Sequence, residues 1–316
     1  MKYCLTILIA IPCIISPPEP PVIVFLKDFT ETPAEIHITQ NPIRDNGLTT
    51  VYINPQSSQQ FRNIAGYTLA DDSPVIDVVC IFAGNYAAAE KPYLRAGNNQ
   101  PPTTKPFNNN IQQILDDGSV KYLQDKGITV LLTILNGHQS VGWSEFTSES
   151  DAMDFALYLK TDVLDKYRLD GIDIDDEYSA GLPNDTSLIM VTTLMRQIMP
   201  DKIISKALWS DQEYFRATWN GHTLAKNLTY GWEMSYGGQP QLLLAPYTQF
   251  GMKKNQLSFG FWSGKLSTNP DQEVKWLKNN GYAGMMVFGF EKQANIGLMG
   301  DLVNNWHGPG NWNPPK

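Results

Sequence analysis

Short apolar runs bounded by Gly, Pro, Asn or Asp recur along the chain from Thr49 onward, and each has the length of a β-strand. Eight of these runs are predicted as strands: residues 50–54, 75–83, 129–136, 169–175, 202–208, 228–236, 256–262 and 284–290. Segments long enough for a helix separate most of them, so the chain alternates between the two kinds of element.

Apolar side chains repeat at helical spacing in four of these segments, which predicts helices within residues 111–123, 155–167, 188–198 and 270–277. Ser148 or Ser150 is the predicted N-cap of the second helix, and Pro200 ends the third. The segments after the fifth and sixth strands have weak helical patterns. Together these patterns predict an α/β fold, one (β/α)8 TIM-type barrel with one or two helices reduced or missing.

The fourth predicted strand carries a carboxylate at every second position near its end. Side chains alternate between the faces of a strand, so Asp173, Asp175 and Glu177 are expected to project to the same side. Like charges on one buried face raise the proton affinity of at least one group. Because active sites of such barrels lie at the C-terminal ends of the strands, this pattern predicts a proton donor. The alternative, a Ca²⁺ loop or a solvated acidic turn, is disfavoured because the spacing and glycine of an EF-hand are missing.

Composition narrows the class of ligand. A net charge of −8 offers no basic stripe for phosphates, which argues against nucleic acid as a partner. The 8 Trp, 14 Tyr and 13 Phe supply rings that suit stacking on carbohydrate, although many of them must be core. The 4 histidines are scattered without the spacing of metal ligands, and no phosphate-binding or dinucleotide-binding motif occurs, so neither a metal nor a cofactor is predicted.

The beginning of the chain predicts export. Residues 1–16 combine a cation with an apolar run too short to span a bilayer, as in a secretory signal peptide. Residues 17–48 are interpreted as a linker and N-terminal extension, and residues 49–316 as the barrel domain. We therefore expect a secreted, periplasmic or cell-surface protein, with a lipid anchor at Cys13 as an alternative. Without the signal, Cys80 alone remains, which predicts a buried structural thiol and no internal disulfide.

The acidic run resembles a known family signature. Residues 170–177 resemble the DGxDxDxE motif of glycoside hydrolase family 18, and the following Tyr178 extends the similarity to its endo-β-N-acetylglucosaminidase branch, the endoglycosidase H and F type. Residues 66–71, 78–85, 124–128 and 199–205 are also similar to that branch, so the resemblance covers about residues 49–300. The chain departs from the branch at residues 136–138, which read Asn-Gly-His, and in the centre of residues 232–238.

The resemblance implies a substrate-assisted retaining mechanism, in which the 2-acetamido carbonyl of the sugar attacks its own anomeric carbon. Glu177 is then the proton donor to the leaving oxygen, kept protonated by its like-charged neighbours. Asp175 is the partner of the acetamido nitrogen, and Asp173 lies deeper and shares a proton with Asp175. Tyr236 is the candidate donor to the acetamido oxygen, with an ordinary barrel aromatic as the alternative.

Six further residues at or near strand ends are candidates for contact with the sugar, and each has an ordinary packing or loop role as its alternative. They are Asn85, Asn136, His138, Tyr178, Trp232 and Trp262. Phe288 and Phe290 are assigned to the core.

The leading interpretation is an endo-β-N-acetylglucosaminidase that cuts the GlcNAc-β1,4-GlcNAc core of N-glycans, with high-mannose glycans favoured by the resemblance. Its partners are then the N-glycans of glycoproteins, with no transmembrane span and a monomer as the expected state. A chitinase of the same family is the alternative within enzymes, and the short segment between Trp262 and Gly284 leaves no room for the small domain that many chitinases insert. An inactive carbohydrate-binding barrel is the other alternative, disfavoured because Asp175 and Glu177 are both present.

Overall fold

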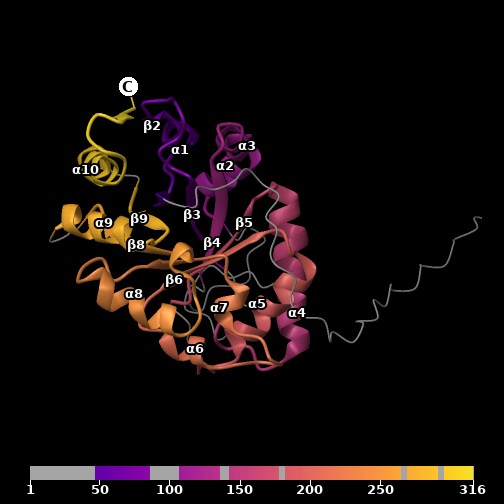
Figure 1. The fold of residues 1–316 in the computed structure, drawn as a ribbon. Helices are drawn as coiled ribbons and strands as arrows, with labels where there is room; N and C mark the ends of the chain where they lie inside the picture. Colours follow the sequence, from indigo (N-terminus) through magenta and orange to yellow (C-terminus); the bar gives the residue numbers. More distant parts are fainter. Residues whose placement is uncertain are drawn as a thin grey trace, which may run out of the picture. The chain divides into compact units, whose positions relative to one another are not determined.

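All eight predicted strands form, and they pair in parallel around a closed barrel (Figure 1). In barrel order they are β1 (Leu48–Ile53), β3 (Val78–Asn85), β4 (Thr129–Leu135), β5 (Gly171–Ile174), β6 (Ile203–Leu208), β7 (Tyr230–Glu233), β8 (Leu257–Trp262) and β9 (Gly284–Phe288). This computed structural model describes residues 47–85, 107–135, 142–177, 182–264, 269–290 and 295–315. The described residues all fall in one unit, Ile36–Lys316, and the predicted barrel is confirmed.

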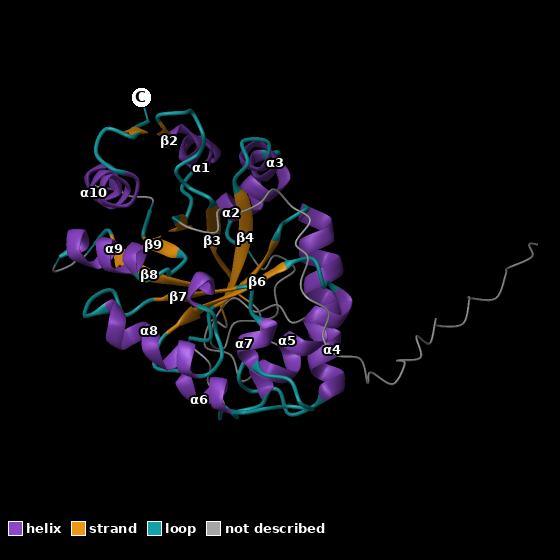
Figure 2. Ribbon diagram, viewed as in Figure 1, coloured by secondary structure: helices purple, strands orange, loops and turns teal. Residues whose placement is uncertain are grey.

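Helices surround the strands on the outside of the barrel (Figure 2). They are α1 (Ser58–Arg62), α2 (Asn109–Asp116), α3 (Ser119–Gln124), α4 (Glu149–Tyr158), α5 (Ser187–Ile198), α6 (Gln212–Arg216), α7 (Leu224–Asn227), α8 (Pro240–Gln249), α9 (Pro270–Asn279) and α10 (Asn295–His307). Of the two predicted caps of α4, Ser148 is the one that forms, since its side chain accepts a hydrogen bond from the Asp151 N–H.

The helices differ from the sequence prediction in two places and agree with it in a third. The helix expected within residues 111–123 is two helices, because Gly118 between them has φ 82°, a left-handed conformation that interrupts the helix. The weak pattern after the fifth barrel strand corresponds to the short helices α6 and α7. After the sixth strand, by contrast, the 10-residue α8 is complete, with Pro240 in its first turn.

A short antiparallel pair outside the barrel was not predicted. It joins β2 (Thr68–Leu69) to β10 (Trp312–Asn313) near the C-terminus. The Tyr67 ring stacks on Trp312 with a centroid distance of 6.4 Å. Strands of two residues are too short to give an alternating pattern in the sequence. Their pairing could therefore not be predicted before the fold was known.

The barrel interior combines apolar and polar side chains. Tyr52, Cys80 and Trp232 belong to an interior apolar cluster distinct from the larger core that also includes helix residues, and Cys80 is fully buried as predicted. Asp173 of β5 is in register with Thr133 of β4 and Ser205 of β6, so polar side chains meet at this level. Asp175 and Glu177 follow the carboxyl end of β5, and this is the end of the barrel at which parallel barrels carry their active sites.

Gly171 permits this arrangement at the start of β5. A Cβ atom at this position would lie 2.1 Å from the Ile203 carbonyl oxygen, which is far below any van der Waals contact. The neighbouring strand can therefore approach closely only where residue 171 lacks a side chain. The glycine of the acidic motif thus has a packing role that is separate from the chemistry of its acids.

Candidate active site

Asp173 is the innermost acid of the motif and is fully buried. Its Oδ2 accepts hydrogen bonds from the hydroxyls of Tyr52 (2.7 Å) and Thr133 (2.9 Å). Its Oδ1 accepts hydrogen bonds from the Ser205 hydroxyl (2.6 Å) and the Trp232 indole N–H (3.0 Å). Burial raises the pKa of Asp173, and these hydrogen bonds oppose that rise because they stabilise the carboxylate. Asp173 is therefore held in place from four strands.

Asp175 and Glu177 continue the motif toward the carboxyl end of the barrel. Asp175 is buried, Glu177 is half-buried, and the Glu177 backbone N–H donates to Asp175 Oδ1 at 3.2 Å. Burial, followed by the charges of Glu177 and Asp173, raises the pKa of Asp175 to about 7. Burial also raises the pKa of Glu177, with the nearby Lys206 opposing it. Burial, rather than the neighbouring charges invoked from the sequence, is thus the main cause at Glu177.

These two acids border a cavity of about 400 Å³, here called the inner cavity. Its full lining is Tyr52, Phe82, Leu135, Asp175, Glu177, Ala207, Trp209, Met234, Ser235, Tyr236 and Phe288. Tyr236 lies beyond the end of β7 with φ 52°, a strained conformation for a residue other than glycine. Burial and the charge of Asp175 raise the pKa of Tyr236, so its hydroxyl keeps its proton and remains a hydrogen-bond donor. The cavity thus combines acids, a phenol and aromatic rings, as a sugar site requires.

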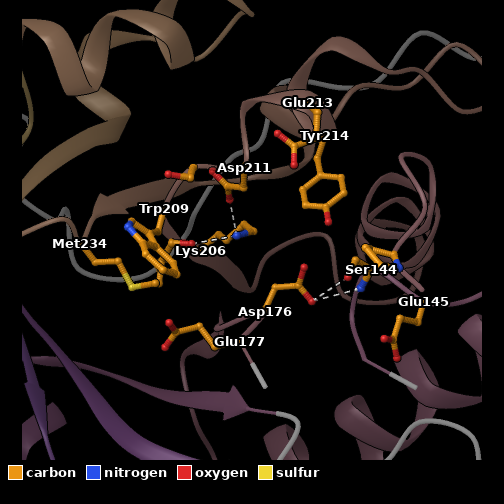
Figure 3. A pocket seen from close by; sticks show the side chains of 13 residues that line it. Ser144, Glu145, Asp176, Glu177, Lys206, Trp209, Asp211, Glu213, Tyr214 and Met234 are labelled. Carbon is orange, nitrogen blue, oxygen red and sulfur yellow. Dashed lines mark hydrogen bonds and ion pairs between the residues drawn. The ribbon is translucent and has the colours of Figure 1, made fainter. Parts of the chain in front are cut away.

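Figure 3 shows the residues that line a second cavity of about 450 Å³, here called the outer cavity. Glu177 lines this cavity as well as the inner one. Asp176 faces it and accepts hydrogen bonds from the Ser144 N–H and hydroxyl, both at 3.2 Å. Lys206 forms a buried ion pair with Asp211 at 2.5 Å. Burial raises the pKa of Asp176 to about 6, and the Lys206 charge opposes this rise. Asp176 thus lines a different cavity from Asp175, although both residues follow the end of β5 at Ile174.

The predicted sugar-contacting residues have different positions in the structure. Trp232 is 0% exposed and its indole N–H is bound to Asp173, so it supports that acid from inside the barrel and offers no free surface to a sugar. The Trp262 ring packs against Tyr236 with a centroid distance of 6.0 Å. Asn85 is half-buried at the carboxyl end of β3, in register with Leu135, which lines the inner cavity.

Three predicted contacts, Asn136, His138 and Tyr178, lie outside the described residues. Some residues that line the cavities were not among the predicted contacts. Phe288, which was assigned to the core, is half-buried and lines the inner cavity, whereas Phe290 is buried as expected. Trp209 lines both cavities and was not singled out. Its position directly after a predicted strand was the one available signal, because strand ends form the site.

Glu233, at the end of β7, is a further buried acid beside the site and is 2% exposed. Its Oε1 accepts hydrogen bonds from the Ser235 N–H and hydroxyl, whereas its Oε2 has no hydrogen-bond partner among the described residues. Burial raises the pKa of Glu233 from 4.5 to about 7. A carboxyl with a raised pKa binds its proton more tightly in the folded than in the unfolded chain, so stability is lost as the pH rises from 4.5 to about 7.

We expect Glu233→Gln to remove this loss. The variant should gain roughly 1–3 kcal/mol in free energy of unfolding at pH 8 relative to wild type, and the gain should be small at pH 5. Urea unfolding of both proteins at the two pH values measures it. Glu213→Gln, at an exposed position, is the control and should show no comparable gain. A gain at Glu233 that did not depend on pH would show that its ionisation is not linked to folding.

Within the part of the chain that the structure describes, no group of three or more His, Cys, Asp or Glu side chains could hold a metal ion. No helix among those residues is both long and apolar enough to cross a membrane. The prediction that no metal takes part in the reaction stays a prediction.

Fold and site together define a class: a (β/α)8 barrel with paired carboxyls on a strand end, beside a cavity lined by aromatic rings. No family model matches the chain. It is 32% identical over 208 residues to an endo-β-N-acetylglucosaminidase of Flavobacterium sp. (strain SK1022), a match of 61% of this chain and 60% of that protein. It is 28% identical over 257 residues to endo-β-N-acetylglucosaminidase F1 of Elizabethkingia meningoseptica, covering 76% of this chain and 70% of that one.

Among solved structures, the chain is similar to EndoBT-3987 of Bacteroides thetaiotamicron, with a TM-score of 0.67 and 21% identity over 85% of this chain and 62% of that one. This likeness shows the fold. The chain spans about three fifths of the Flavobacterium relative and of EndoBT-3987. Both curated relatives are named endo-β-N-acetylglucosaminidases, which confirms the resemblance to the endo-β-N-acetylglucosaminidase branch.

Proposed function

We propose that this chain is an endo-β-N-acetylglucosaminidase that hydrolyses the GlcNAc-β1,4-GlcNAc core of N-glycans by substrate-assisted retaining catalysis. The observation that carries the proposal is the Asp175–Glu177 pair at one wall of the inner cavity, with Tyr236 lining the same cavity. The names of the two curated relatives support the reaction. EndoBT-3987 has been crystallised with a Man9GlcNAc2Asn substrate and with a Man5GlcNAc product, which supports high-mannose glycans as substrates here.

The protonation of the Asp175–Glu177 pair suits this reaction. Two carboxyls that repel each other in a buried site hold one proton between them up to nearly neutral pH, and without substrate Asp175 keeps it up to a pH of about 7. An acetamido N–H that donates to Asp175 favours the Asp175 anion and leaves the proton to Glu177. One member can then protonate the leaving oxygen while the other remains an anion. Glu177 is the donor because it borders both cavities, and the bond to be cut must lie where the two sugars meet.

Asp175 has the position of the anion. It is buried, and in the inner cavity it is accompanied by Tyr236. A GlcNAc ring bound there would present its acetamido N–H to Asp175 and its acetamido oxygen to the Tyr236 hydroxyl. These two contacts orient the acetamido carbonyl for attack on the anomeric carbon, and Asp175 stabilises the positive charge that develops on the ring formed. Asp173 acts through Asp175, since its charge contributes to the raised Asp175 pKa.

The test is mass spectrometry of a glycoprotein with high-mannose chains after incubation with the wild-type protein. We expect each glycan to be lost with one GlcNAc left on its asparagine. Cleavage of chitin oligomers with intact glycoprotein would identify a chitinase instead, and no change in either substrate would favour a carbohydrate-binding barrel. The short connection between β8 and β9, which includes α9, has no room for the small domain that many chitinases insert, and this supports an N-glycan over chitin as the substrate.

A further inference from the structure

Trp209 is an exposed aromatic ring at the point where the two cavities meet. Its side chain follows β6 and is 55% exposed, whereas most tryptophans of the described chain are buried or half-buried. Trp209 lines both cavities, a property that it shares with Glu177, Ala207 and Met234. Figure 3 shows its ring beside Met234, across the outer cavity from Ser144. An exposed apolar ring needs no explanation alone, but this one borders the proposed proton donor.

The backbone around Trp209 is firmly held. The Lys206 ammonium donates to the carbonyl oxygen of Ala207, before Trp209 in the chain, at 2.8 Å, and to Asp211, after it, at 2.5 Å. The Tyr247 hydroxyl also donates to Asp211, at 2.7 Å. Ser210, directly after the ring, has φ 50°, a left-handed conformation that a residue other than glycine adopts at a cost. The ring is thus mounted on a fixed segment, as a binding platform should be.

The arrangement of the two cavities indicates which sugar would contact the Trp209 ring. Asp175 and Tyr236, the proposed partners of the acetamido group, line the inner cavity and not the outer one. The sugar that supplies the acetamido group therefore occupies the inner cavity. Glu177 must reach the oxygen between two sugars, so the sugar on the leaving side passes Glu177 into the outer cavity. Trp209 spans that passage.

We propose that Trp209 is the platform on which the leaving GlcNAc, the sugar that stays on asparagine, stacks during cleavage. The C–H face of a pyranose ring packs on an indole, whereas the hydroxyls at its edge need polar partners. Glu213 and Tyr214 line the outer cavity and would be such partners. This inference rests on the proposed function, since it names the sugar bound on the leaving side of the same site.

The experiment measures binding of the two product halves separately, by NMR titration. One probe is N-acetylglucosaminyl-asparagine and the other is Man5GlcNAc, each added to wild type, Trp209→Ala and Trp209→Phe. We expect Trp209→Ala to weaken binding of the first probe roughly 10- to 100-fold, the factor that burial of one large apolar side chain is worth. Binding of Man5GlcNAc should change little, and Trp209→Phe should recover much of the loss.

Tyr122→Ala is the matched control, because Tyr122 is 40% exposed on α3 and lines neither cavity of the site. It should bind both probes as wild type does, and circular dichroism should show all variants folded. Weaker binding of Man5GlcNAc alone, or of neither probe, would overturn the proposal. Since the probes are products, the result does not depend on turnover. Failure of the wild type to cleave glycoprotein would instead count against the proposed function.

Discussion

Replacing Glu177 by glutamine is expected to slow release of the glycan about 100- to 10,000-fold, the range over which a positioned proton donor acts. The amide has nearly the same shape as the carboxyl but has no acidic proton for the leaving oxygen. Because Glu177 is half-buried and burial already disfavours its charge, the variant should fold with the stability of wild type. The rate is measured by mass spectrometry of a high-mannose glycoprotein over time, with unfolding in urea as the parallel measurement.

Glu149→Gln is the control for this substitution, since Glu149 is exposed in the first turn of α4, far along the chain from the acidic motif. It should cleave at the rate of wild type. Full activity in the Glu177 variant would show that another group is the acid. Asp176, which also faces the outer cavity, would then be the next candidate, because burial raises its pKa to about 6.

The strands could be predicted from the sequence because the barrel buries them on both faces. A strand buried in this way is a continuous apolar run, and eight such runs gave eight barrel strands. The ends of the strands were predicted less accurately. The strand expected at 228–236 ends at Glu233, and Tyr236 beyond it has a left-handed backbone conformation, which a strand does not contain. β5 likewise ends at Ile174, so Asp175 lies just beyond the strand that was expected to end with it.

The alternating pattern could not predict how deep in the barrel an inward-facing side chain lies. Alternation correctly places Trp232 and Asp173 inside, but it does not tell whether an inward ring reaches the cavity or lies beneath it. Trp232 lies beneath and donates to Asp173. Trp209 was missed for a related reason: it follows a strand end, and its exposure depends on the fold of residues 206–211. Phe288 was assigned to the core because an apolar residue at a strand end looks the same whether it is covered or lines a cavity.

The substitution Asp175→Asn is expected to slow cleavage about 100- to 1,000-fold while leaving glycan binding nearly unchanged. The carboxamide still fits the buried position, but it has no charge with which to stabilise the positive ring formed from the acetamido group. Since that charge develops after binding, the loss should be in kcat and not in KM. Steady-state kinetics on a labelled high-mannose glycopeptide separates the two, and binding of Man5GlcNAc by NMR titration gives the affinity independently.

The pH profile of the same variant gives a sharper test. In wild type the rate should fall as the pH rises through about 7, because the Asp175–Glu177 pair then loses the proton that the leaving oxygen needs. Repulsion between two carboxylates is mutual, so an uncharged residue 175 lets Glu177 release its proton at a lower pH. The fall in rate of Asp175→Asn should therefore begin below that of wild type. A variant that kept both the wild-type rate and the wild-type profile would show that Asp175 takes no part in the reaction.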